Sequence, residues 1–292
     1  MKLFVWDFHG VLEKDNEFAP AYSGIATTYI GLMQMGFTSP SIGIPKIYEN
    51  TQKALELDPN YSDSHLTSAI MGVWTEWNWE KGESEFLKAL ELNPNDVMAH
   101  AYYAHLLMIL LRSEEAYDHI NIAMELDPLN PLIQTLYGIV LYQKGDYEDA
   151  IAQAEKAISV VPNHTLGWRV LFLTYHSMGE SQKLFNAFIQ TLTLDNETKN
   201  TLNNIFKENG FTAAMNQLSI SLEEIFQTGF VQPITIGISY ATIHKNDEAM
   251  KWLEKAYEMH DPDMPYIQCL PIYTQLEDET GYIELVEKMK FK

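Results

Sequence analysis

The histidines are the residues of this chain whose type best suits metal binding or acid–base chemistry, because an imidazole ligates zinc and titrates near neutral pH. His100 and His105 lie five residues apart, whereas two ligands on one helical face need a spacing of three or four. No Asp or Cys completes a zinc set around them, so we expect no metal and interpret both as groove or surface residues. The sequence has no G-x-x-x-x-G-K-[ST] loop, G-x-S-x-G elbow or G-x-G-x-x-G turn. Nucleotide binding, serine hydrolysis and a cofactor therefore have no local support.

The first residues carry a second candidate for chemistry. The stretch KLFVWDFHGVLEKD resembles the opening motif of haloacid-dehalogenase-like phosphatases, an apolar strand followed by D-x-D-G-[TV]. The resemblance implies a nucleophile at Asp7, but His9 stands at the position of the second aspartate. That family also needs further motifs on a doubly wound sheet, for which a helical chain leaves no room. The alternative is the apolar stripe of a truncated helix, formed by Phe4, Phe8, Val11 and Leu12.

The elements that follow repeat along the chain. The segment ALELDPNYSDSH from Ala54 has counterparts in ALELNPND from Ala89, AMELDPLNP from Ala123 and AISVVPNH from Ala157. The prolines that close these units fall 35, 34 and 34 residues apart, at Pro59, Pro94, Pro128 and Pro162. A fixed period of this size indicates a helical solenoid, because a helix pair cannot bury its apolar face until a neighbouring pair stacks on it.

Each unit has a second helix with small residues on one face. Aligned residues at this face are Ala54, Ala89, Ala123, Ala157, Thr191 and Ala256, and seven residues earlier come Ile47, Gly82, Ala116, Ala150, Leu184 and Ala249. Offsets of seven and three keep side chains on one helical face, and small residues let helices approach closely. The first helix of a unit carries sets such as Trp168, Leu171 and Tyr175.

These two helices resemble helix A and helix B of the tetratricopeptide repeat, W-x-x-L-G-x-x-Y and A-x-x-x-F-x-x-A-L-x-x-x-P. The resemblance implies an all-α fold, a right-handed superhelical solenoid of antiparallel helix pairs. We expect a partial helix B or an unrelated segment at residues 1–17, the repeat array at 18–195, an irregular helical repeat at 196–230, and a final repeat with capping helices at 231–292. The turn formers of GFTSPSIGIP, residues 36–45, predict a long first loop between helices.

Two segments, residues 74–94 and 247–267, look like the repeat modules that follow catalytic or DNA-binding domains in bacterial signalling proteins. Those proteins include adenylate cyclases, serine/threonine kinases and winged-helix regulators. The resemblance implies a regulatory or assembly module and no active site, because such proteins keep their chemistry in a separate domain.

Composition limits the partners and the compartment. A net charge of −21, from 40 acidic and 19 basic residues, would repel nucleic acid and anionic membranes, so we expect a protein or peptide partner. Acid-rich surfaces that simply keep the chain soluble are an alternative explanation. The apolar runs are well short of the ~20 residues of a membrane span. The N-terminus lacks a secretory pattern and Cys269 stands alone, which together favour the cytoplasm.

The resemblance implies a concave surface lined by successive A helices. Projecting the repeat frame places there an apolar and aromatic set, Met71, Trp74, His105, Met108, Thr135, Ile139, Tyr142, Arg169, Leu173 and His176. The carboxylate clamp of Lys, Asn and Arg that some family members use for acidic tails is missing. An extended apolar segment or an amphipathic helix fits such a groove better. Contact with another part of the chain or with a symmetry mate is the alternative, and for the cluster Trp74, Trp77 and Trp79 core packing is favoured over a ligand platform.

Three hypotheses follow. The first is a non-catalytic interaction scaffold, the second a phosphatase-derived enzyme that uses Asp7, and the third a self-assembling structural array, which would make the chain a homo-oligomer.

Overall fold

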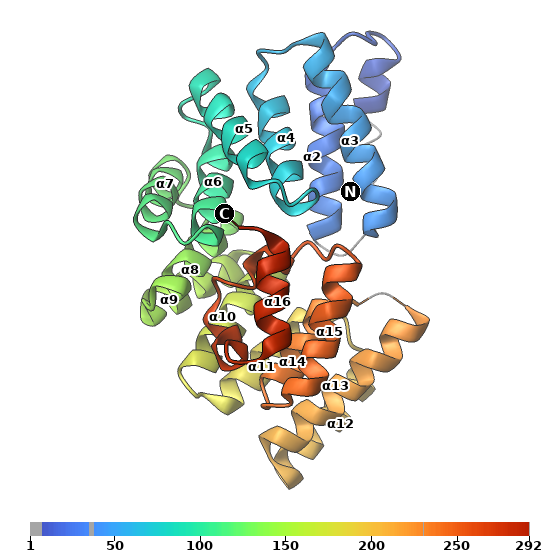
Figure 1. The fold of residues 1–292 in the computed structure, drawn as a ribbon, viewed down its shortest axis with the longest axis vertical. Coiled ribbons are helices and arrows are strands. Elements are labelled where there is room, and N and C mark those ends of the chain that lie inside the picture. The colour runs from blue at the N-terminus through green and yellow to red at the C-terminus, as the bar shows by residue number, and fades with distance from the viewer. Residues whose placement is uncertain (1–7, 35–37, 230, 292) are drawn as a thin grey trace. The chain divides into compact units, whose positions relative to one another are not determined.

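The computed structural model describes residues 8–34, 38–229 and 231–291. These residues form helices joined by short turns and contain no strand, which confirms the predicted all-α class of paired helices. Contacts divide the chain into two compact units, of which unit 1 ends at Leu106 and unit 2 begins at Leu107. Figure 1 shows the helix pairs within each unit.

Unit 1 contains two helix pairs. Helix α2 (Ala19–Gln34) packs against α3 (Pro40–Leu57), and α4 (Ser62–Trp74) packs against α5 (Trp79–Leu92). Helices α2 and α4, the A helices of the two pairs, also contact each other. Helix α6 (Val97–Ile109) follows and crosses the boundary between the units. Before α2, residues 8–12 are helical, and the ring of Phe8 packs over Gly24. Asp7 lies outside the described residues.

Unit 2 continues the pairing. Its first complete helix is α7 (Ser113–Leu126). Four helix pairs follow in the described part of this unit. They are α8 (Pro131–Lys144) with α9 (Tyr147–Val160), α10 (Thr165–Ser177) with α11 (Ser181–Thr191), α12 (Asn196–Asn209) with α13 (Phe211–Thr228), and α14 (Pro233–Ala241) with α15 (Asn246–Glu258). Two 3₁₀ helices, η1 (Met264–Tyr266) and η2 (Pro271–Leu276), and helix α16 (Thr280–Met289) complete the chain. The A helices α8 and α10 contact each other, and η2 contacts α10 and α14.

The predicted small-residue face of the B helices is confirmed as a buried face. Ala54, Ala89, Ala123, Ala157 and Ala256 are all fully buried, while Thr191, the sixth predicted position, is half-buried. The small side chains let the two helices of a pair approach closely.

Helices α4 and α5 approach each other closely at two glycines. A Cβ placed on Gly72 of α4 would lie 3.0 Å from the backbone nitrogen of Gly82 in α5. Any side chain at Gly72 would therefore push the two helices apart.

The predicted long loop at residues 36–45 is wrong in extent. Helix α3 already begins at Pro40 and runs through Pro45. Pro40 is tolerated because the first turn of a helix has no use for its amide hydrogen, and its ring pre-sets the helical φ. Pro45 is exposed, so the carbonyl that it leaves without an internal donor can bond to water.

A hydrogen bond closes the turn between successive repeats at the same place each time. Six residues after the closing proline, a side-chain nitrogen lies within hydrogen-bonding distance of that proline's carbonyl oxygen. The four instances are His65 Nε2 to Pro59 at 2.9 Å, His100 Nε2 to Pro94 at 3.1 Å, Gln134 Nε2 to Pro128 at 2.9 Å and Trp168 Nε1 to Pro162 at 2.9 Å. These bonds give a partner to a backbone carbonyl in the turn, just beyond the end of the B helix.

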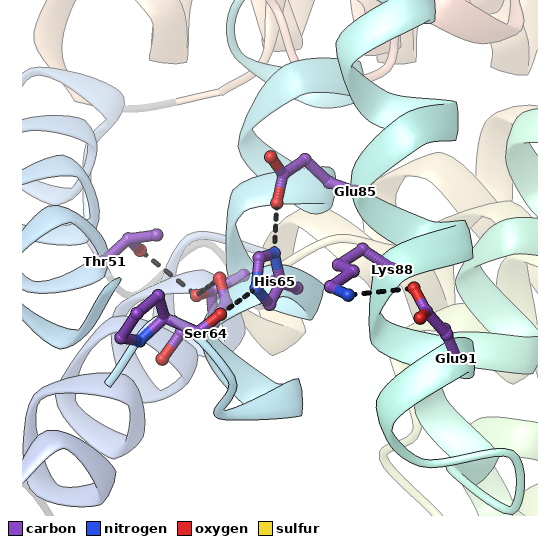
Figure 2. A network of polar contacts seen from close by, with 8 residues as sticks. Thr51, Ser64, His65, Glu85, Lys88 and Glu91 are labelled. Atoms are coloured by element: carbon purple, nitrogen blue, oxygen red, sulfur yellow. Dashed lines mark hydrogen bonds and ion pairs between the residues drawn. The ribbon is translucent and has the colours of Figure 1, made fainter. Parts of the chain in front are cut away.

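The turn at His65 extends into a polar network in unit 1 (Figure 2). The Nδ1 atom of His65 lies 2.7 Å from a carboxylate oxygen of Glu85 on α5, while Nε2 faces Pro59. Nearby, Lys88 and Glu91 form an ion pair of 2.9 Å on the surface of α5. His65 therefore links the inter-repeat turn to the B helix of its own repeat, which is a structural role.

Among the described residues, none of the helices combines the length and the apolar character that crossing a bilayer would demand.

Candidate functional site

The A-helix residues predicted to line a binding groove are largely buried. Met71, Met108, Thr135, Ile139, Tyr142 and Leu173 are each at most 7 % exposed, and His105 is fully buried. Trp74, Arg169 and His176 are half-buried. His100, the other histidine of the sequence-based pair, is 6 % exposed, so neither of the two lies on the surface.

In unit 1, the predicted residues Met71 and Trp74 lie on α4. The ring of Trp74 meets that of Tyr102 edge-on, with centroids 5.5 Å apart. This geometry is favourable for aromatic packing and agrees with a core role for Trp74. Met71 borders an open pocket.

That pocket lies between α3 and α4 and has a volume of about 380 Å³. It falls in the lower part of the ~300–1,000 Å³ range of small-ligand pockets. Its lining comprises Tyr48, Thr51, Gln52 and Leu55 from α3, Ser68 and Met71 from α4, and Glu76 and Lys81 from the loop and the start of α5. The surface is mixed, with an apolar floor of Leu55 and Met71 and a polar rim.

The rim of this pocket is held by local contacts. Lys81 Nζ lies 2.7 and 2.8 Å from the two carboxylate oxygens of Glu76, and Gln52 Nε2 donates to the hydroxyl of Tyr48 at 2.9 Å. Asn78 accepts from the backbone N–H of Lys81 at 3.0 Å and caps the N-terminus of α5. This cap positions the Glu76–Lys81 pair at the mouth of the pocket.

In unit 2, the predicted A-helix residues contact another part of the same chain. We use the term C-terminal segment for residues 261–276. Arg169 of α10 forms an ion pair with Asp263 of this segment at 2.7 Å. Burial raises the pKa of the Tyr142 hydroxyl on α8, and the nearby backbone of Ile272 opposes that rise. Thr135 is used locally, because its hydroxyl donates to Pro131 and Leu132 within α8.

The ion pair at Arg169 is shielded from water. Its two side chains are 22 % and 17 % exposed. Burial alone would lower the pKa of Arg169, but the charge and hydrogen bond of Asp263 outweigh burial and raise it. The guanidinium therefore stays charged and selects a carboxylate as its partner.

A second acid of the C-terminal segment, Asp261, is 3 % exposed. Its carboxylate accepts from the backbone N–H of Ile234 at 3.2 Å and from that of Asp263 at 3.0 Å. Helix α14 begins after Gln232, which makes no capping bond, so Asp261 supplies the missing cap from 27 residues away. Desolvation, followed by the charge of Asp263, raises the pKa of Asp261 to about 7.

The remaining nucleophilic and metal-ligating groups do not gather into a site. Cys269 is buried, and burial raises the pKa of its thiol, which keeps it protonated and unreactive. Burial lowers the pKa of His176, and the charge of His244 lowers it further, so the imidazole stays neutral. Residues 8–34, 38–229 and 231–291 contain no group of three or more potential ligands that could hold a metal ion.

The architecture defines a class, a protein built of stacked antiparallel helix pairs. The tetratricopeptide repeat family matches residues 133–164, which lie in α8, α9 and the turn that follows. The described residues form a tetratricopeptide-like helical repeat structure. Proteins of this type are typically scaffolds for protein interactions and are generally not enzymes.

Three proteins of known sequence or structure are similar to this chain. Tetratricopeptide repeat-containing protein trd-1 of Caenorhabditis elegans is 26% identical over 120 residues, which cover 41% of this chain and only 16% of trd-1. Human IFIT1, solved as a dimer with PPP-AAAA, has a TM-score of 0.55 at 17% identity, covering 87% of this chain and 67% of that one. The Cut9–Hcn1 structure of the APC/C has a TM-score of 0.53 at 14% identity, covering 99% of this chain and 45% of that one. At such identities the likeness shows the fold alone.

Proposed function

We propose that the chain is a non-catalytic scaffold that binds a peptide or helical segment of a partner protein, as a regulatory or assembly module of a cytoplasmic bacterial signalling system. The repeat type supports the scaffold role. The pocket between α3 and α4 is the single observation that carries a binding site in this structure.

The chemistry of this pocket suits a side chain of a bound segment. Leu55 and Met71 offer an apolar floor, and the flexible Met adapts to different shapes. Tyr48 is 47 % exposed at the rim and can cover an inserted side chain at a small loss of conformational entropy. The strongly negative chain favours a protein ligand over a nucleic acid.

Site-specific photo-crosslinking tests this proposal. A photoreactive phenylalanine analogue is introduced at Tyr48 of the full chain and, as a matched control, at Leu87, which is 51 % exposed on α5. We expect one partner to be captured from the source cells at position 48 and not at position 87. Equal capture at the two positions would count against the pocket.

The captured partner is then purified and titrated against point variants. Tyr48→Ala should weaken its binding by about tenfold or more, as for an aromatic anchor, whereas Leu87→Ala should leave it unchanged. Unchanged binding of the Tyr48 variant would remove the pocket from the proposal. Sedimentation velocity of the chain alone distinguishes this scaffold from a self-assembling array, which would show larger species as concentration rises.

A further inference from the structure

The C-terminal segment differs in kind from the repeats that it covers. Its regular structure consists of the short 3₁₀ helices η1 and η2, and its local backbone hydrogen bonds, such as that from the N–H of Ile267 to the carbonyl of Met264 at 3.0 Å, close single turns. Element contacts place η2 on two A helices, α10 and α14. The segment therefore covers A helices, and the sequence predicts that A helices line the ligand-binding surface.

Several of its anchors are polar contacts between a side chain and the underlying helices. Asp263 pairs with Arg169 of α10. Gln268 Nε2 donates at 2.8 Å to the carbonyl of Ile109, the last residue of α6. Gln275 donates to the carbonyl of Ala241, the last residue of α14. The carbonyl of Ile109 lies at a helix end, which leaves it without a helical donor, whereas the carbonyl of Ala241 also accepts from the backbone N–H of His244 at 2.9 Å.

Apolar residues of the segment fill the space between these anchors. Met264, Ile267, Ile272 and Leu276 are fully buried, and Tyr273 is 1 % exposed. The face beneath therefore accepts a chain of turns and 3₁₀ helices with a carboxylate at one end and a large ring ten residues later. Such burial keeps the segment bound to its own face in most molecules.

We propose that the C-terminal segment is an intramolecular ligand of the A-helix face of unit 2, and that a partner segment of the same chemistry replaces it. That partner carries an acidic residue that pairs with Arg169 and an aromatic ring in the place of Tyr273. The site is separate from the pocket between α3 and α4, so the two proposals stand or fall independently. Binding at this face is regulated, because the chain's own segment must leave first.

Competition with a peptide tests the replacement. A fluorescent peptide with the sequence of residues 259–278 is titrated into the full chain. A tethered segment competes at an effective concentration in the millimolar range, so the wild-type chain should show no binding up to about 100 μM. The Asp263→Asn/Gln268→Ala variant, in which Arg169 and the carbonyl of Ile109 lack their partners, should bind the peptide at least about tenfold more tightly.

The peptide titration has two controls and one alternative chain variant. Glu258→Gln removes an exposed ion pair with Lys255 immediately before the segment and should behave as wild type. A peptide carrying D263N should lose most of the affinity gained by the variant. The milder Gln268→Ala chain repeats the titration if the double variant does not fold, as judged by circular dichroism.

Hydrogen exchange supplies an independent readout on the wild-type chain. The amides of residues 264–276 should exchange faster than those of α10, because the segment opens while the helices stay folded. Equal protection of both, together with no peptide binding to either variant, would show that the segment belongs to the permanent core and would overturn the proposal. Concentration-dependent dimers without peptide binding would also overturn it, because the occupant would then be a second copy of this chain.

Discussion

Replacing Asp261 by Asn should reverse its effect on stability between acidic and alkaline pH. Asp261 is buried where the C-terminal segment meets α14, and its pKa is raised from 3.8 to about 7 chiefly by desolvation, with a further contribution from the charge of Asp263. An acid with a raised pKa stabilises the folded state most at low pH. That stability falls as pH rises from the unfolded pKa of 3.8 to the folded value near 7, and is constant above it.

The size of the effect follows from these two pKa values. Between about pH 5 and about pH 8 the unfolded carboxyl is ionised throughout, while the folded carboxyl passes from protonated to ionised. At about 1.4 kcal/mol per pKa unit, this change lowers the free energy of unfolding by about 2.5 kcal/mol. The opposing effect of Arg169 is already contained in the folded pKa of about 7.

The Asn variant loses this pH dependence and pays a fixed penalty. Asp261 accepts from the backbone N–H groups of Ile234 and Asp263, whereas an Asn side chain has one acceptor oxygen and would leave one N–H unsatisfied, at about 1 kcal/mol. The variant should therefore be about 1 kcal/mol less stable than wild type near pH 5 and about 1.5 kcal/mol more stable near pH 8.

Urea unfolding at both pH values measures the difference, and hydrogen exchange of α14 amides localises it to unit 2. Titration of all other groups cancels in the comparison of wild type with variant. A difference between the two proteins that is the same at both pH values, within about 0.5 kcal/mol, would refute a raised pKa for Asp261.

Three further predictions follow from the packing. Gly72→Ala should destabilise unit 1 by about 1–3 kcal/mol in thermal unfolding, because its Cβ would meet the backbone of α5. The control Gly31→Ala has open space around the new Cβ and should be neutral or stabilising by up to about 1 kcal/mol. Gln134→Ala should cost about 1 kcal/mol through loss of the bond to the carbonyl of Pro128, measured by urea unfolding; no change would remove this bond from the repeat's stability. Cys269 should resist alkylation in the native chain, because it is buried and the pKa of its thiol is raised. Mass spectrometry should find fast labelling only after urea is added. Fast labelling of the native chain would contradict the burial of Cys269.

Much of the repeat packing could be predicted from the sequence, because each repeat buries the same face against its own partner and its nearest neighbours. The small residues Ala89 and Ala123 are buried where the period placed them. The sequence holds one further signal, a residue with a side-chain N–H donor six positions after each closing proline. It is carried by His, Gln and Trp in turn, so residue identity hid a position that spacing alone would have found.

What the repeat period could not predict is which A-helix residues a partner can reach. The contacts that cover Arg169 and Ile109 come from residues 94 and 159 positions further along the chain, in a segment with no counterpart in the repeats. Local periodicity carries no information about such pairs, because they form only when the whole array brings distant segments together. The sequence by itself determined helix pairs and their buried faces; tertiary structure alone decided that the C-terminal segment covers the A-helix face of unit 2 and that a pocket stays open between α3 and α4.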